Sequence, residues 1–312
     1  MAMHVLGAAA TYVLGRHAAR GFESAAALTL LRAIIASALL LSCTGWLVPR
    51  PRFSRRDWWQ VFGLGILLVP LNQLCFLTGM QNTVPGHPAV IYAMTPIGVV
   101  ALSSVMARAW PPRRKLLGVL AALAGVLIVL RPWVHGADFA EIRRGDFWLL
   151  AGLLIWVVYT VAVRPLARRH DSRTVTTWTV VAGTLVLAPF AALPLARTNL
   201  TELEPQVWAG VLWLAVVTSA AMMLLWNRML RHLEPVEVAI CTNAQPVATG
   251  LLVWMLAVLG LEAPASEQDL GVLFWVGTAL VIAGVVLVQM RASSANAGGS
   301  KAPVIASREG RQ

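Results

Sequence analysis

The stretch LGVLAALAGVLIVLR (Leu117–Arg131) occurs again near the end of the chain as VGTALVIAGVVLVQMR (Val276–Arg291). In each copy two glycines stand seven residues apart, an alanine precedes the second glycine, and an aliphatic run ends at an arginine. Ala89–Pro96 and Ala239–Pro246 form a second matched pair, with seven residues from the alanine to the proline in both. Internal repeats with matched spacing predict that the chain consists of two copies of one structural unit.

The composition is typical of a membrane protein. The chain is 58% hydrophobic and only 12% charged, whereas soluble domains carry roughly 25% charged residues. A helix needs about 20 apolar residues to cross the hydrocarbon core, and the absence of strand-like alternation favours helices over a barrel. We therefore predict an all-α integral membrane protein with ten transmembrane helices, at residues 1–16, 25–48, 59–80, 86–107, 116–131, 147–165, 174–195, 206–227, 234–257 and 270–290.

The net charge of +11 is distributed unevenly between the two predicted sides. The even-numbered loops and the C-terminal tail hold 18 of the 25 basic residues, and the odd-numbered loops hold six. Basic loops mark the cytoplasmic side of a membrane. We therefore expect a multi-pass protein of the plasma membrane with both termini in the cytoplasm. Membrane topology accounts for the charge, so no nucleic-acid partner is expected.

The repeat divides the chain into two halves. Residues 1–132 form the first copy, 133–146 an outer linker, 147–291 the second copy, and 292–312 a Ser-, Ala- and Gly-rich tail that we expect to be disordered in the cytoplasm. The first span is predicted to be short, because Met1 to Gly15 reaches only about 22 Å at 1.5 Å per residue. We expect that Met1 lies inside a truncated first helix.

Five spans in each copy is an odd number, so the second copy enters the membrane from the opposite face. The chain is therefore predicted to contain two inverted five-helix repeats. Such repeats recur in secondary transporters, where two similar halves move around a central site to expose it alternately to each side. The alternative is that duplication only enlarged a helical bundle.

The order of several short strings resembles one known family over residues 1–291. The strings are LTLLRAIIASALL with Arg32, AVIYAMTP, KLLGVLAALAGVLIVL, WVVYTV and SAAMMLLWN. The chain is similar to the drug/metabolite transporter superfamily in its ten-span form with two EamA domains. The resemblance implies a small-molecule permease, and the expected direction of export comes from the resemblance alone. The chain departs from the family pattern in its first span, and at Arg108-Ala109 where an acid commonly closes the fourth span.

A polar face precedes a proline in both the fourth and the ninth predicted helices. Thr242 and Gln245 stand three residues apart and so share one helical face. A proline removes a backbone donor and favours a kink, which opens carbonyl groups onto a cavity. The cavity candidates here are Tyr92, Thr95, Thr242, Asn243 and Gln245, with helix kinks at Pro96 and Pro246.

The third, sixth and eighth predicted helices carry further candidates. Gln73, Phe76 and Met80 map through the repeat onto Ser219, Met222 and Trp226. Aromatic and methionine residues at helical spacing pack a core or contact a ligand, and the sequence leaves both interpretations open. Including the amides beside these faces and an aromatic pair, the cavity candidates are Asn72, Gln73, Trp156, Tyr159, Ser219, Trp226 and Asn227.

Arg32 is the only basic residue well inside a predicted span. An arginine near the middle of the membrane costs about 2.5–3.5 kcal/mol on insertion scales, and its long side chain can reach toward the membrane surface. Arg32 is therefore a candidate for a structural or gating role, and direct contact with substrate is the alternative.

No carboxylate falls at the middle of a predicted span, so a proton relay of buried acids is not expected. No nucleotide-binding loop, zinc-protease motif, hydrolase elbow or cysteine–metal spacing is present. We therefore expect no enzyme activity, cofactor or metal.

The leading hypothesis is a secondary transporter of small amphipathic metabolites, such as amino acids or drugs, that works by alternating access. Its expected partners are a small-molecule substrate and the lipid bilayer, and its oligomeric state is open. A lipid flippase or other lipid-handling protein, an intramembrane enzyme and a non-transporting receptor are the alternatives.

Overall fold

The computed structural model describes residues 2–47, 52–83, 87–130, 144–245, 247–248, 251, 255 and 272–289. Helices dominate this part of the chain, and no strand occurs in it. Five of the described helical segments are long and apolar enough to cross a membrane, by length and composition. The first half contains α1 (Ala2–Gly21), α2 (Ala25–Leu47), α3 (Arg55–Ile66), η1 (Leu67–Gln73), α4 (Leu74–Gln81), α5 (His87–Ala93), α6 (Thr95–Ala107) and α7 (Arg113–Leu130).

The second half contains α8 (Arg144–Arg169), α9 (Ser172–Arg197), α10 (Pro205–Leu212), η2 (Trp213–Met222), α11 (Met223–His232), α12 (Pro235–Ala239), η3 (Ile240–Ala244) and α14 (Val272–Gln289). Each predicted span is helical wherever the chain is described, apart from Met94 and Glu234. The predicted tail, residues 292–312, and most of the predicted linker lie outside the described residues.

The first helix is longer than the sequence pattern predicted. It continues from the apolar run to Gly21 and contains 20 residues, which correspond to about 30 Å of helix. The helix therefore extends beyond the predicted apolar span, and the truncation of the first span stays a prediction. The prediction ended the span at its first arginine, whereas the helix continues past Arg16 and includes Arg20.

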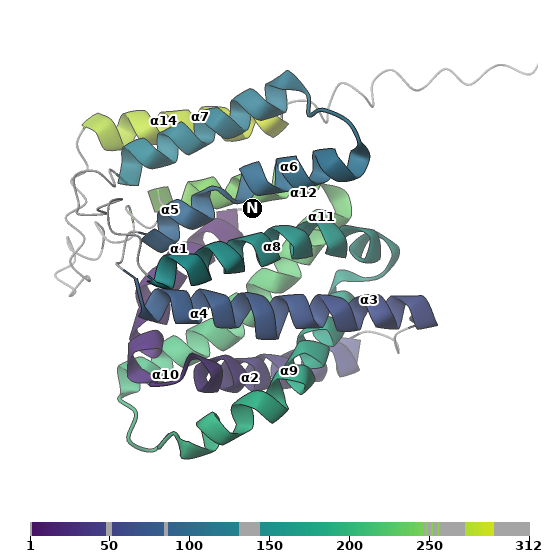
Figure 1. Cartoon of the computed structure of the whole chain (residues 1–312), viewed down its shortest axis with the longest axis vertical. Helices are drawn as coiled ribbons and strands as arrows, with labels where there is room; N and C mark the ends of the chain where they lie inside the picture. The colour runs from purple at the N-terminus through teal and green to yellow at the C-terminus, as the bar shows by residue number, and fades with distance from the viewer. Residues whose placement is uncertain are drawn as a thin grey trace, which may run out of the picture.

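The repeated Gly-Ala-Gly helices, α7 and α14, pack against each other at one end of the bundle (Figure 1). A methyl group added at Gly125 would lie 2.6 Å from the carbonyl oxygen of Gly277, and one added at Gly284 would lie 2.5 Å from that of Gly118. The start of each helix thus meets the end of the other, so the pair is antiparallel and the contacts are reciprocal. Small residues thus let the two helix backbones approach each other closely.

The first helix of each half lies along the third segment of the other half. Helix α1 contacts α10 and η2 of the segment α10–η2–α11, and helix α8 contacts each part of the segment α3–η1–α4. Gly21 in α1 packs against Val207 at the start of α10. Gly79 in α4 packs in the same way against Leu149 in α8. The two halves are therefore interleaved.

One π-helical segment interrupts the third segment of each half, and the two segments lie at matched positions. η1 begins at Leu67 and η2 at Trp213, which are 146 residues apart (213 − 67), the same separation as Gln60 and Gln206. Pro70 lies inside η1 and lacks a backbone donor, but η2 contains no proline. Wide turns of this kind are rare and cluster at functional sites. The sequence pattern predicted regular helix at both places.

The fourth segment (α5 and α6) and the ninth segment (α12 and η3) are also interrupted at matched positions. α5 ends at Ala93 and α6 begins at Thr95, with Met94 as its N-cap. In the ninth segment, α12 gives way to the 3₁₀ turn η3, which ends at Ala244, 150 residues after Met94. The predicted kink near Pro96 is thus a break between two helices. Pro246, the second predicted kink, lies outside the described residues.

Gly125→Ala tests the close contact between α7 and α14. The added methyl group would press on the backbone of Gly277, so we expect unfolding to become easier by about 1–3 kcal/mol. Gly63→Ala is the matched control, because an added methyl group there meets nothing within 4 Å, and alanine favours helix by about 1 kcal/mol over glycine. Thermal unfolding of the purified protein measures both changes. Equal unfolding midpoints for the two variants would contradict the packing described.

Candidate functional site

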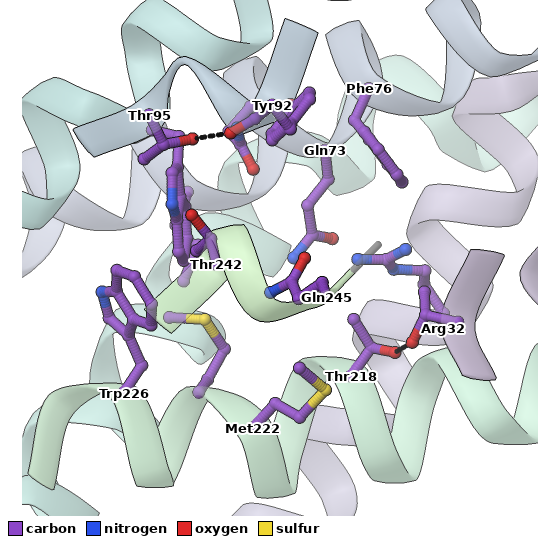
Figure 2. A pocket seen from close by; sticks show the side chains of 15 residues that line it. Arg32, Gln73, Phe76, Tyr92, Thr95, Thr218, Met222, Trp226, Thr242 and Gln245 are labelled. Carbon is purple, nitrogen blue, oxygen red and sulfur yellow. Dashed lines mark hydrogen bonds between the residues drawn. The ribbon is translucent and has the colours of Figure 1, made fainter. Parts of the chain in front are cut away.

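A cavity of about 140 Å³ lies at the centre of the bundle, between the two halves. Its walls come from every interrupted segment and from α1, α2 and α8 (Figure 2). The lining residues are Thr11, Arg32, Leu68, Asn72, Gln73, Phe76, Tyr92, Thr95, Trp156, Thr218, Met222, Met223, Trp226, Thr242 and Gln245.

Most of the residues selected from the sequence meet at this cavity. The predicted candidates on its wall are Asn72, Gln73, Tyr92, Thr95, Trp156, Trp226, Thr242 and Gln245, together with Arg32. They come from distant parts of the chain and from both copies of the repeat. Their role in binding a solute stays a prediction.

The break before Pro96 positions the polar face of the fourth segment. Pro96 has no N–H to donate to the carbonyl oxygen of Tyr92, four residues earlier. The hydroxyl of Thr95 donates to that oxygen instead, at 2.5 Å. In the other half, Thr242 makes a similar bond one turn earlier in the ninth segment, from Oγ1 to the carbonyl oxygen of Ala239 at 2.7 Å. Threonine hydroxyls thus satisfy carbonyl groups next to both interruptions.

The end of η1 places two amides on the cavity wall. Asn72 donates from Nδ2 to the carbonyl oxygen of Gly152 in α8 at 2.8 Å. Gly152 also lets the Tyr92 hydroxyl lie close to α8, since a methyl group at Gly152 would lie 2.8 Å from its oxygen. Gln73 is buried, and its Oε1 accepts no hydrogen bond in the described structure. Asn72 therefore braces two helices, while Gln73 keeps an acceptor available.

Two aromatic pairs form apolar walls. Trp156 and Trp226 meet with their ring centroids 5.0 Å apart, and Phe76 meets Tyr92 edge-to-face at 5.3 Å. Met222 and Met223 lie beside the tryptophans on the cavity wall. Rings and thioethers provide an apolar surface that adapts to ligand shape.

Tyr159 and Asn227 were predicted to line the cavity, and the structure places them behind its wall. Tyr159 stacks on Trp156 with centroids 5.6 Å apart. Asn227 is fully buried, lies 3.3 Å from the Tyr159 hydroxyl and donates to Thr176 Oγ1 at 2.8 Å. The polar network that satisfies these side chains ties α8 to α9 and α11.

Ser219 and Asn243 were also predicted candidates, and neither reaches the cavity wall. Both are buried. Thr218 lines the cavity in place of Ser219, because the face was assigned from regular helical spacing whereas η2 follows the wider spacing of a π-helix. Asn243 lies in the 3₁₀ turn η3, beside the polar face of the ninth segment.

Six lining residues were not among the cavity candidates selected from the sequence: Thr11, Leu68, Phe76, Thr218, Met222 and Met223. Thr11 and Thr218 share a hydrogen bond of 2.9 Å, and Thr11 Oγ1 also accepts the indole N–H of Trp213 at 3.1 Å. Thr11 was not predicted as a site residue, because the first span departs from the family pattern. Leu68 and Met223 carry no polar group by which a site search selects residues.

Arg32 does not reach toward the end of its helix. Its side chain is 3% exposed and lies on the cavity wall. The guanidinium group points into the space beside the Gln73 and Gln245 amides (Figure 2). Its side chain is therefore directed to the cavity and not to the membrane surface that its length could also reach, and its structural or gating role stays a prediction.

The cavity suits binding more than covalent chemistry. Its lining combines amides, hydroxyls, aromatic rings and one guanidinium group, and no carboxylate of the described residues lies on its wall. The described part of the chain contains no group of three or more His, Cys, Asp or Glu residues arranged to hold a metal ion. Such a lining accommodates an amphipathic molecule.

The EamA-like transporter family matches the chain in two regions, residues 1–131 and 143–290. The uncharacterized transporter YyaM of Bacillus subtilis (strain 168) is 24% identical over 224 residues, which cover 72% of this chain and 70% of that protein. A protein of Streptantibioticus cattleyicolor named "Probable terminal-alkyne amino-acid exporter" is 27% identical over 277 residues, covering 85% and 84% of the two chains.

A solved crystal structure shares the fold. It superposes with a TM-score of 0.66 at 18% identity and covers 93% of this chain and 98% of its own. The matched regions coincide with the two halves described above and include both repeated Gly-Ala-Gly helices. The chain is a multi-pass membrane protein that belongs to the EamA-like transporter family.

Proposed function

We propose that this chain is a secondary transporter that exports a small amphipathic solute by alternating access. The observation that carries the proposal is the central cavity, to which both halves contribute side chains at matched interruptions of their helices. A site shared between two similar units is the arrangement that allows it to open to either side in turn.

The packing of the two halves supports an inverted repeat of five helices each. The antiparallel contact of Gly125 with Gly277 and of Gly118 with Gly284 is reciprocal. Exchanging the two halves by a two-fold axis between α7 and α14 reproduces this contact. The same exchange relates the pairing of α1 with α10 and η2 to that of α8 with α3 and η1. Ten spans with both termini in the cytoplasm of the plasma membrane complete this topology.

Different contacts join the helices at the two ends of the cavity. At the end with more basic residues, Asp57 lies 3.1 Å from Arg169 and 3.2 Å from His170, which joins α3 to the end of α8. At the other end, Thr83 donates to Asp146 at 2.5 Å and Gln81 donates to the carbonyl oxygen of Ala19 at 2.9 Å. Opening the cavity to either side requires one of these sets to separate.

The lining favours a solute with a polar head and an apolar body. The amides of Gln73 and Gln245 offer hydrogen bonds, while Trp156, Trp226 and Met222 offer an apolar surface. A relative is named as an amino-acid exporter, and an amino acid has this chemistry. We therefore propose amino-acid-like metabolites as the substrate class.

A comparison of culture media from cells with and without the protein identifies the solute. We then expect Gln73→Ala to reduce the rate of its release about five- to tenfold, because a hydrogen bond in a buried site contributes about 1–1.5 kcal/mol. Gln206→Ala is the matched control, since Gln206 is exposed on α10, away from the cavity. Radiolabelled solute released from proteoliposomes measures both rates.

No change in the medium, together with no solute flux in proteoliposomes, would contradict the exporter proposal. Scrambling of fluorescent lipids by the same proteoliposomes would favour a lipid flippase instead.

Pro96→Ala tests the break between α5 and α6. Alanine supplies the N–H that proline lacks, so the backbone of the fourth segment is free to bond to the Tyr92 carbonyl and form one continuous helix. We expect transport to slow several-fold with an unfolding midpoint at or above that of the wild type. Pro194→Ala in α9 removes a proline from a helix that does not line the cavity. Equal transport rates for the two variants would show that the break has no role in transport.

A further inference from the structure

Arg32 carries a positive charge inside the bundle, and none of the described residues that line the cavity is a carboxylate. Its side chain is 3% exposed, and its Nε and Nη1 atoms make no hydrogen bond in the described structure. Burying an unpaired charge is costly, and proteins normally pair such groups with an opposite charge. Membrane helices that keep a buried arginine do so for a functional reason more often than a structural one.

The described carboxylates all lie away from the cavity, at or just before helix starts. Each belongs to a cap, a first helical turn or a loop that leads into a helix, namely Glu23, Asp57, Asp146, Asp171, Glu202, Glu204, Glu234 and Glu237. Several of them already bind basic groups on the bundle ends, as Asp57 does with Arg169. The described cavity wall therefore presents a cation, and a molecule that enters the cavity can supply its counter-ion.

We propose that Arg32 binds the carboxylate group of the transported solute. This inference rests on the proposed transport function and names the chemical class of its substrate. The planar guanidinium fork matches a carboxylate with two parallel hydrogen bonds. Nε belongs to the side-on fork with Nη2, and Nη1 belongs to the end-on fork with Nη2, so each fork has a nitrogen without a partner in the described structure.

The groups around Arg32 fix how such a solute lies. The amides of Gln73 and Gln245 lie beside the guanidinium group (Figure 2), where they form hydrogen bonds to the polar head. Trp226 and Met222 lie across the cavity and provide the apolar surface for the body of the solute. The site thus selects a carboxylate at one end and an apolar group at the other.

Four probes of similar size separate the carboxylate from the rest of the molecule. Norleucine and hexanoate carry a carboxylate, whereas norleucinamide and hexylamine do not. The unfolding midpoint of the purified full chain, titrated with each probe, gives an apparent Kd. We compare the wild type with Arg32→Gln, which removes the charge, and with Arg32→Lys, which keeps the charge but lacks the fork.

We expect both carboxylates to raise the unfolding midpoint of the wild type and to bind Arg32→Gln about ten- to hundredfold more weakly. Arg32→Lys falls between the two, and the amide and amine show no dependence on Arg32. Without a probe, Arg32→Gln unfolds no more easily than the wild type, because the substitution removes an unpaired charge. If the carboxylates stabilise the wild type no more than Arg32→Gln, including the case of no stabilisation at all, the proposal is overturned.

Transport assays distinguish this failure from failure of the transport proposal. Normal release by Arg32→Gln with impaired release by Gln73→Ala overturns the carboxylate assignment and leaves transport through the cavity intact. Normal release by both variants overturns transport through this cavity.

Discussion

Backbone carbonyl groups inside an apolar bundle must find a hydrogen-bond partner, and this constraint determines where the helices of the chain are interrupted. A membrane tolerates irregular backbone only where it is buried in protein or lines a cavity. All four described interruptions, at η1, at Met94, at η2 and at η3, adjoin the same cavity. Next to two of them a threonine hydroxyl bonds to a main-chain carbonyl, as Thr95 does with Tyr92. The polar site and the broken backbone are thus two aspects of one arrangement.

The unbroken helices α7 and α14 pack closely against each other and do not line the cavity. Their glycines bring two backbones together so closely that a methyl group at Gly125 or Gly284 would overlap the facing carbonyl. They contain no residue on the cavity wall. A firm pair of helices beside interrupted ones gives the bundle both a rigid element and segments that adapt to a solute.

Much of the fold could be predicted from the sequence because apolar length and repetition determine it. The repeated glycine spacing located α7 and α14, and the matched stretches Ala89–Pro96 and Ala239–Pro246 paired the fourth segment with the ninth. The polar faces with Tyr92, Thr95, Thr242 and Gln245 followed from that pairing, and all four residues lie on the cavity wall. Tertiary packing decided the rest. The π-helical turn in η2 exchanged Ser219 for Thr218, and no local pattern in the sequence signals such a turn where proline is absent.

Other predictions failed because side-chain surroundings are set by partners distant in sequence. Asn227 has the polarity of a site residue, but its amide is satisfied by hydrogen bonds with Tyr159 and Thr176. The sequence places Arg32 in a helix, but it does not predict what surrounds the side chain, because elements from both halves form that environment. The structure shows it facing a space without a protein carboxylate among the described residues that line it.

The central claim is that one cavity between two inverted halves opens to each side of the membrane in turn. Replacing Met222 on the cavity wall by cysteine, after substitution of Cys43, Cys75 and Cys241, allows a direct measurement of access. We predict that a membrane-impermeant maleimide labels this cysteine in both right-side-out and inside-out vesicles, while a cysteine replacing the packed Val281 of α14 stays unlabelled. Labelling from one side only, in a variant that still transports, would contradict the account.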